Sequence, residues 1–155
     1  SILDGSVDTD KFIQFIKISQ QINIQNYLGS KLYDKYTTII GNGDIDTAPF
    51  ADYKELLNEY IQPMLIWFAQ VDYIPFAAYQ IKNGGVFKHT SENAETVNKT
   101  EVDYLVEKAR TYAEWYSRRF IDYMCFNQST FPEYTTNVND DIYPSYDATF
   151  NGWVL

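Results

Sequence analysis

Apolar side chains recur every three to four residues along the segment from Thr100 to Phe126. This spacing is typical of an α-helix that turns one face toward a core. The apolar face comprises Val102, Leu105, Val106, Ala109, Tyr112, Ala113, Tyr116, Phe120 and Tyr123. Thr100 and Asp103 resemble a capping box at its start, with Asp in place of the usual Glu. A helix of this length favours a mainly α fold.

Three earlier segments show the same periodicity, namely residues 8–29, 32–40 and 51–78. Asp8 or Thr9 is the expected cap of the first helix, and Gly29 is its expected stop. The second segment ends at the sequence Gly41-Asn42-Gly43-Asp44, which breaks regular structure. Together with the helix at 100–126, these segments predict a bundle of about four helices.

Two prolines interrupt the third segment, and each removes a backbone donor and crowds the preceding turn. We expect a kink near Glu59 to Pro63 and a break or second kink near Pro75. The periodicity is then lost over residues 82–99, which predict a long loop or a short β excursion. Residues 1–126 are therefore interpreted as a helical bundle domain.

Residues 127–155 are interpreted as an extended C-terminal arm. They contain four acids, no Lys or Arg, and six aromatic residues: Phe131, Tyr134, Tyr143, Tyr146, Phe150 and Trp153. So many large rings are costly to leave in water, and the polar, Pro-containing sequence does not favour a helix. We expect the arm to lie at least partly on another chain, so that deleting residues 129–155 leaves the bundle folded but abolishes assembly.

The net charge of −9 argues against a protein that holds nucleic acid by neutralising phosphates. No apolar run approaches the length of about 20 residues that crosses a bilayer, and we expect no membrane contact and a soluble chain made in a cytoplasm. His89 is the only histidine and Cys125 the only cysteine. Zinc sites built from two or more histidines are therefore excluded, and no second cysteine is present to compensate.

Acidic residues near position 50 resemble part of a calcium-binding loop. Asp44, Asp46 and Glu55 match positions one, three and twelve of an EF-hand, but Pro49 stands where that loop needs glycine. His89 has no Gly-flanked serine to serve as a nucleophile in a Ser-His-Asp set. We expect no catalytic residue, no metal site and no cofactor.

Arg118 and Arg119 lie beside Tyr116 and Tyr123, and this cluster has three interpretations. It is a stacking platform for single-stranded nucleic acid, a helix face with local ion pairs, or a receptor for the acidic arm of a neighbouring copy. We nominate as interface residues Phe87, His89, Arg110, Arg118, Arg119, Phe131, Tyr134, Tyr143, Tyr146, Phe150 and Trp153.

Three stretches, in this order, resemble the head-to-tail connector or adaptor proteins of tailed phages that infect Bacteroidetes, including the crAss-like group. The stretches are Ile22–Tyr33, Tyr53–Leu57 with Tyr60–Pro63, and Lys82–Val86 with Ser91–Asn93. The resemblance implies a small helical bundle that is located in the neck of the virion and is assembled in the host cytoplasm. It also implies a homo-oligomeric ring of about twelve copies beneath the portal protein.

In this interpretation the partners are further copies of the chain, the portal protein and tail-side ring proteins, and DNA passes through the channel without specific binding. Twelve copies would carry 12 × −9 = −108, and a negative lumen would keep DNA from adhering. Two alternatives are a monomeric Tyr-rich module that binds a glycan or peptide, and an enzyme with an unrecognised carboxylate site.

Overall fold

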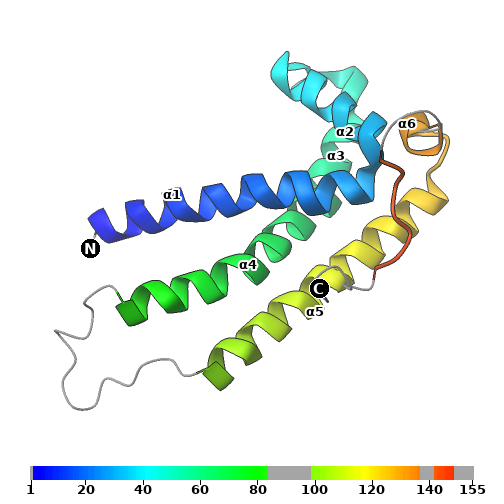
Figure 1. The fold of residues 1–155 in the computed structure, drawn as a ribbon. Coiled ribbons are helices and arrows are strands. Elements are labelled where there is room, and N and C mark those ends of the chain that lie inside the picture. Colours follow the sequence, from blue (N-terminus) through cyan, green and yellow to red (C-terminus); the bar gives the residue numbers. More distant parts are fainter. Residues whose placement is uncertain (1, 84–98, 137–141, 149–155) are drawn as a thin grey trace.

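The computed structural model describes residues 2–83, 99–136 and 142–148, which form a helical bundle without a strand (Figure 1). The mainly α fold predicted from the sequence is confirmed. The α-helices are α1 (Ile2–Ser19), α2 (Gln25–Gly41), α3 (Ala51–Leu56), α4 (Gln62–Asn83), α5 (Lys99–Phe126) and α6 (Pro132–Thr135). Between them lie two π-helical turns, η1 (Gln20–Ile24) and η4 (Leu57–Ile61), and two 3-10 turns, η2 (Asp44–Asp46) and η3 (Ala48–Phe50).

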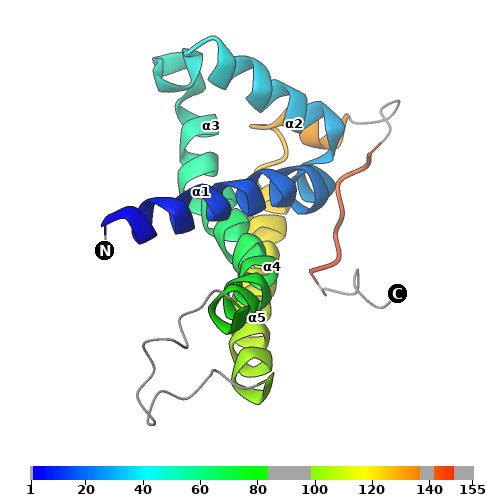
Figure 2. The same cartoon turned by 60° about the vertical axis from the view of Figure 1, so that its left-hand side comes forward.

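Helix α4 lies between α1 and α5. The antiparallel α5 runs along one side of α4, and α1 crosses the other side (Figures 1 and 2). Edge-to-face rings join α1 to α4, with the centroids of Phe12 and Tyr73 5.2 Å apart. On the other side, Trp67 of α4 contacts Tyr112 of α5, with centroids 4.7 Å apart.

The core gathers at the end of the bundle where α2, α3, α4 and α5 meet. Its fully buried large side chains include Leu28, Leu32, Ile39, Leu56, Met64, Phe68, Phe120, Met124 and Phe131. Burying such side chains stabilises each site by about 1.5–3 kcal/mol relative to exposure. This cluster fixes how α5 is oriented, and therefore which of its faces reaches the surface.

The predicted stop at Gly29 is confirmed, because this residue has φ 78° and ψ 159° inside the segment of α2. The helix before it begins at Ile2, earlier than the predicted cap at Asp8 or Thr9. It also passes through η1, where the N–H of Gln25 donates to the carbonyl of Gln20. After α2, Gly43 adopts φ 76° at the predicted break.

The two prolines of the third segment behave differently. At the kink expected near Glu59 to Pro63, the structure has the wider π-helical turn η4, which directly precedes α4. A break near Pro75 is wrong, because α4 continues to Asn83, whereas the alternative of a second kink there stays a prediction. Contacts with α1 and α5 support the helix on both sides, and such tertiary packing outweighs local propensity. The loop or β excursion predicted for residues 82–99 is wrong at its ends, since residues 82 and 83 belong to α4 and residue 99 to α5, and residues 84–98 lie outside the described residues.

The helix predicted from Thr100 to Phe126 is confirmed as α5, which starts one residue earlier at Lys99. Its buried residues are Ala109, Ala113, Ser117, Phe120, Ile121 and Met124. The predicted apolar face is wrong at two positions, since Leu105 and Tyr112 are exposed. The true core face is narrower, and the small side chains of Ala109, Ala113 and Ser117 make up half of it, which lets α4 approach closely.

A tyrosine network ties α2 and α3 to α6. The hydroxyl of Tyr36 donates to the carbonyl of Tyr53, 2.8 Å away, and the hydroxyl of Tyr53 donates to both carboxylate oxygens of Glu133. Burial, followed by the hydrogen bond to Glu133, raises the pKa of Tyr53, and burial is also the main reason why the pKa of Tyr36 is raised. Both phenols therefore remain protonated in the folded protein at neutral pH.

Candidate functional site

The outward face of α5 carries a row of large rings. Trp115 is 58% exposed and Phe126 is 89% exposed, and Tyr104 and Tyr112 are exposed on the same side. We call the α5 outer stripe the six exposed residues Tyr104, Lys108, Tyr112, Trp115, Asp122 and Phe126. Their spacings of three, four and seven residues place them together, opposite the buried core face. Exposed rings in a contiguous row mark an interaction surface.

A hollow of about 450 Å³ opens within this face. We call it the arginine-aromatic hollow, and its lining residues are Tyr60 from η4 and Trp115, Arg118, Arg119, Asp122, Tyr123 and Phe126 from α5. The rings of Tyr60 and Tyr123 stack within it, with centroids 4.2 Å apart. The hollow thus offers flat apolar faces next to cationic groups, an arrangement that suits aromatic side chains and anions.

Arg119 holds α5 against η4. One guanidinium nitrogen donates to the carbonyl of Glu59 at 2.7 Å, and the guanidinium carbon lies 4.2 Å from the centroid of the Tyr60 ring. Pro63 has no N–H to offer the carbonyl four residues before it, which is that of Glu59. Arg119 therefore supplies the hydrogen-bond donor that Pro63 lacks. Although we nominated Arg119 as an interface residue, it has a structural role inside its own chain.

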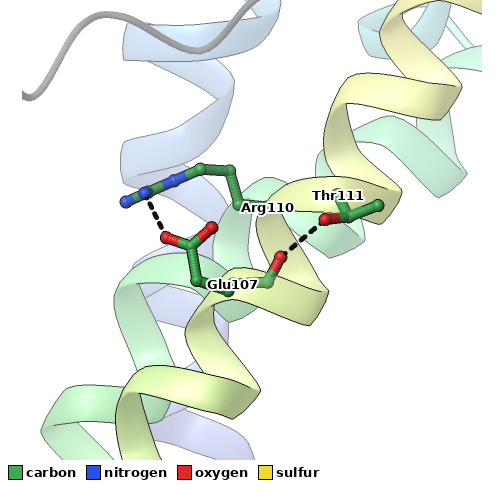
Figure 3. Close-up of polar contacts among 3 residues, drawn as sticks. All are labelled: Glu107, Arg110 and Thr111. Carbon is green, nitrogen blue, oxygen red and sulfur yellow. Dashed lines mark hydrogen bonds and ion pairs between the residues drawn. The ribbon is translucent and has the colours of Figure 1, made fainter.

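The other two nominated arginines differ in their surroundings. Figure 3 shows that Arg110 reaches Glu107, with a guanidinium nitrogen 2.7 Å from the carboxylate, while Thr111 donates to the carbonyl of Glu107. Arg118 is exposed and forms no ion pair or hydrogen bond with the part of the chain that the structure describes. The structure brings Arg118 and Arg119 together in the hollow and leaves Arg110 outside it.

Two rings expected to contact another chain lie in the core of their own chain. Phe131 is 0% exposed and Tyr134 is 2% exposed. Phe131 lies against Tyr53 with centroids 5.1 Å apart, and Tyr134 contacts Phe120 at 6.0 Å. Both rings fill space at the end of the bundle beside α3 and α5. They are therefore unavailable as surface contacts, contrary to expectation.

Residues 142–148, which we call the strap, lie on the kink at Gly29 of the same chain. The N–H of Ser30 donates to the carbonyl of Ile142 at 3.0 Å, and the N–H of Ser145 donates to the carbonyl of Asn26 at 2.9 Å. The hydroxyl of Tyr27 donates to the carbonyl of Asp147 at 3.0 Å. The expectation that the arm lies on another chain is thus corrected for the strap, because the kink exposes backbone groups that it satisfies.

The strap still presents two nominated rings to solvent, with Tyr143 61% and Tyr146 63% exposed. The ring of Tyr146 contacts that of Tyr134, which packs against Phe120 on the core face of α5. These rings are therefore separate from the α5 outer stripe, which faces the other way. The nominated residues Phe87, His89, Phe150 and Trp153 lie outside the described residues.

Sequence reasoning missed the residues that shape the hollow, above all Trp115, Tyr60 and Phe126. A usable signal was present, because Trp115 and Phe126 occur at helical spacing on the side opposite Ala109 and Ala113. Only the structure could bring Tyr60 to the same place.

The described residues contain no group of three or more His, Cys, Asp or Glu side chains arranged to hold a metal ion. No helix in the described ranges is both long and apolar enough to span a membrane.

Fold and site together define a mainly α-helical bundle protein that presents an arginine-aromatic surface. Residues 24–147 match the model of the family of unknown function DUF6712, and the chain belongs to this family. No curated protein and no solved structure gives a significant match.

Proposed function

We propose that this chain is a structural virion protein, a portal adaptor that forms a ring between the portal and the tail of a phage. The sequence resemblance to head-to-tail connectors of Bacteroidetes phages supports the proposal. The ring would hold about twelve copies, extend the DNA channel and meet tail-side ring proteins below. Its acidic surface, at −9 per copy, would limit adhesion of passing DNA.

One observation carries the proposal: the chain exposes aromatic rings on two separate surfaces. These surfaces are the α5 outer stripe and the strap tyrosines Tyr143 and Tyr146. A closed ring is built from head-to-tail contacts, in which one patch of each copy meets a different patch of the next. Aromatic residues are enriched in such contacts because they bury a large area at small entropic cost.

The test is assembly on the portal protein encoded by the same phage. Wild-type chain mixed with the assembled portal is expected to form closed rings, visible by electron microscopy as an added layer with a matching increase in mass. The double variant Tyr143→Ser with Tyr146→Ser should lose the ring while keeping its helical circular dichroism. Tyr79→Ser, at an equally exposed tyrosine of α4, is the matched control and should assemble.

A chain that stays monomeric beside the portal, at high concentration, would overturn the proposal. The arginine-aromatic hollow favours a second candidate, a monomeric module that binds a glycan or peptide. Stacked rings beside a cation are a common platform for such ligands. Saturable binding to a glycan or peptide array that is abolished by Trp115→Ala, without ring formation on the portal, would establish this alternative instead.

A further inference from the structure

Five of the six residues of the α5 outer stripe are placed symmetrically about Trp115. Lys108 stands seven residues before Trp115 and Asp122 seven residues after it, while Tyr104 and Phe126 stand eleven residues before and after. Seven and eleven residues are close to two and three full turns of an α-helix, so all five side chains share one face. In chain order these five side chains are aromatic, basic, aromatic, acidic and aromatic, and the sixth, Tyr112, has Arg118 as its counterpart on the other side of Trp115.

We infer that two copies of the chain pair through this face, with their α5 helices antiparallel and Trp115 at the two-fold axis. Antiparallel pairing brings each residue beside its counterpart on the other side of Trp115. Lys108 then lies beside Asp122 of the second copy, and Tyr104 beside Phe126. The two-fold axis generates each contact twice, which is the defining property of a self-complementary interface.

The side chains are free to make these contacts. Asp122 forms no ion pair or hydrogen bond with the part of the chain that the structure describes. Lys108 has its ammonium 5.7 Å from the centroid of the Tyr104 ring and forms no ion pair within the same ranges. Opposite charges at matched positions favour the antiparallel direction. A parallel pair would instead place Lys108 against Lys108 and Asp122 against Asp122, which is repulsive.

The arginine-aromatic hollow fits this arrangement, since it lies on the C-terminal side of Trp115. In the antiparallel pair, that stretch of α5 faces the residues that precede Trp115 in the second copy. Tyr112 of the second copy is then placed to enter the hollow beside Arg118 and Arg119, where a ring and a guanidinium attract each other. A large side chain in a surface hollow is the usual anchor of a protein interface.

This pair is a different assembly from the proposed ring, because a ring uses two different patches and the pair uses one patch twice. The ring and the pair would both use the outer face of α5. If the proposed function holds, the pair therefore has to dissociate before the ring can form. The pair itself does not depend on the portal. Its test therefore uses the full chain alone, and a failure here leaves the portal experiment unaffected.

The experiment is sedimentation over a concentration series with charge-reversal variants. Wild-type chain should sediment as a dimer at high concentration, and Lys108→Glu and Asp122→Lys should each raise the dissociation constant about tenfold or more, since each creates two like-charge contacts. The double variant Lys108→Glu with Asp122→Lys should restore pairing, because the charges are exchanged. Lys17→Glu, an exposed change on α1, is the matched control.

A second measurement tests whether Trp115 lies at the two-fold axis of the pair. Trp115→Cys in a Cys125→Ser background should form a disulfide-linked dimer on mild oxidation, because residues at a two-fold axis meet their own copy. A strictly monomeric wild-type chain would overturn the inference. Single reversals that weaken the dimer without rescue by the exchange would also overturn it, as would a dimer that none of these variants affects.

Discussion

Gly29→Ala is expected to destabilise the protein strongly, because two costs fall on the same residue. The backbone of Gly29, at φ 78° and ψ 159°, lies in a region that essentially only glycine occupies. Forcing alanine into such a conformation costs about 1–3 kcal/mol. In addition, the new Cβ would stand 2.8 Å from both Cδ and Cγ of Pro144, so the strap must move.

The strap sets the size of the second cost. The hydrogen bonds donated by Ser30, Ser145 and Tyr27 help to hold it at the kink, and each contributes about 1 kcal/mol net. If the strap detaches, the total loss is about 5 kcal/mol, and if it only shifts, the loss is about 2 kcal/mol. One kcal/mol lowers the melting temperature by about 2–4 °C in a domain of this size.

Urea unfolding followed by circular dichroism measures the total, and hydrogen exchange at the amides of Ser30 and Ser145 reports whether the strap has left. The double variant Gly29→Ala with Pro144→Ala removes the two closest contacts, those with the ring carbons, and leaves the backbone nitrogen of residue 144 at 3.1 Å, so it should recover most of the steric part and leave about 2 kcal/mol of backbone strain. A free energy of unfolding for Gly29→Ala within about 0.5 kcal/mol of wild type would refute both the left-handed kink and the strap contact.

Four further outcomes are expected. Arg119→Met should cost about 1–2 kcal/mol in urea unfolding, from the lost hydrogen bond and ring contact; no loss would mean that solvent replaces the guanidinium fully. Phe131→Ala should cost about 3–5 kcal/mol, and deleting residues 129–155 should therefore weaken the bundle itself, contrary to our expectation from sequence. Because folding raises the phenol pKa values of Tyr36 and Tyr53, their contribution to stability is complete below the unfolded value of 10.0 and declines as pH rises above it. Melting temperatures between pH 9 and 12 check this, and Tyr36→Phe should flatten the curve. Burial also raises the pKa of Asp72 above 3.8, so ionised Asp72 disfavours folding at neutral pH; Asp72→Asn should raise the melting temperature at pH 7 and have little effect below pH 3.8.

Local sequence signals located most helix limits. The recurrence of apolar residues placed α5 to within one residue of its observed start, and Gly29 and Gly43 marked the two sharp turns. These signals work because helix periodicity and positive φ are properties of neighbouring residues. A local signal was misleading at Pro75, where we expected the helix could break. Packing of α4 between two helices keeps the chain helical there.

The site was less predictable, because burial depends on residues far apart in the chain. Composition showed that residues 127–155 hold many rings, but not that Phe131 and Tyr134 enter the core while Tyr143 and Tyr146 stay exposed. Arg118 and Arg119 were nominated together, yet the two arginines differ. Arg119 is engaged by Glu59, sixty positions earlier, and no local pattern indicates that contact.

By itself, the sequence determined that this protein is a mainly α-helical bundle with breaks at glycines, and that its acidity does not suit phosphate binding. Only the tertiary structure decided which of the described aromatic rings remain at the surface and where the strap lies. The physical reason is that a helix is defined by contacts within four residues. A strap, a hollow or an exposed helix face is defined by contacts that span the whole chain, such as the one from Asn26 to Ser145.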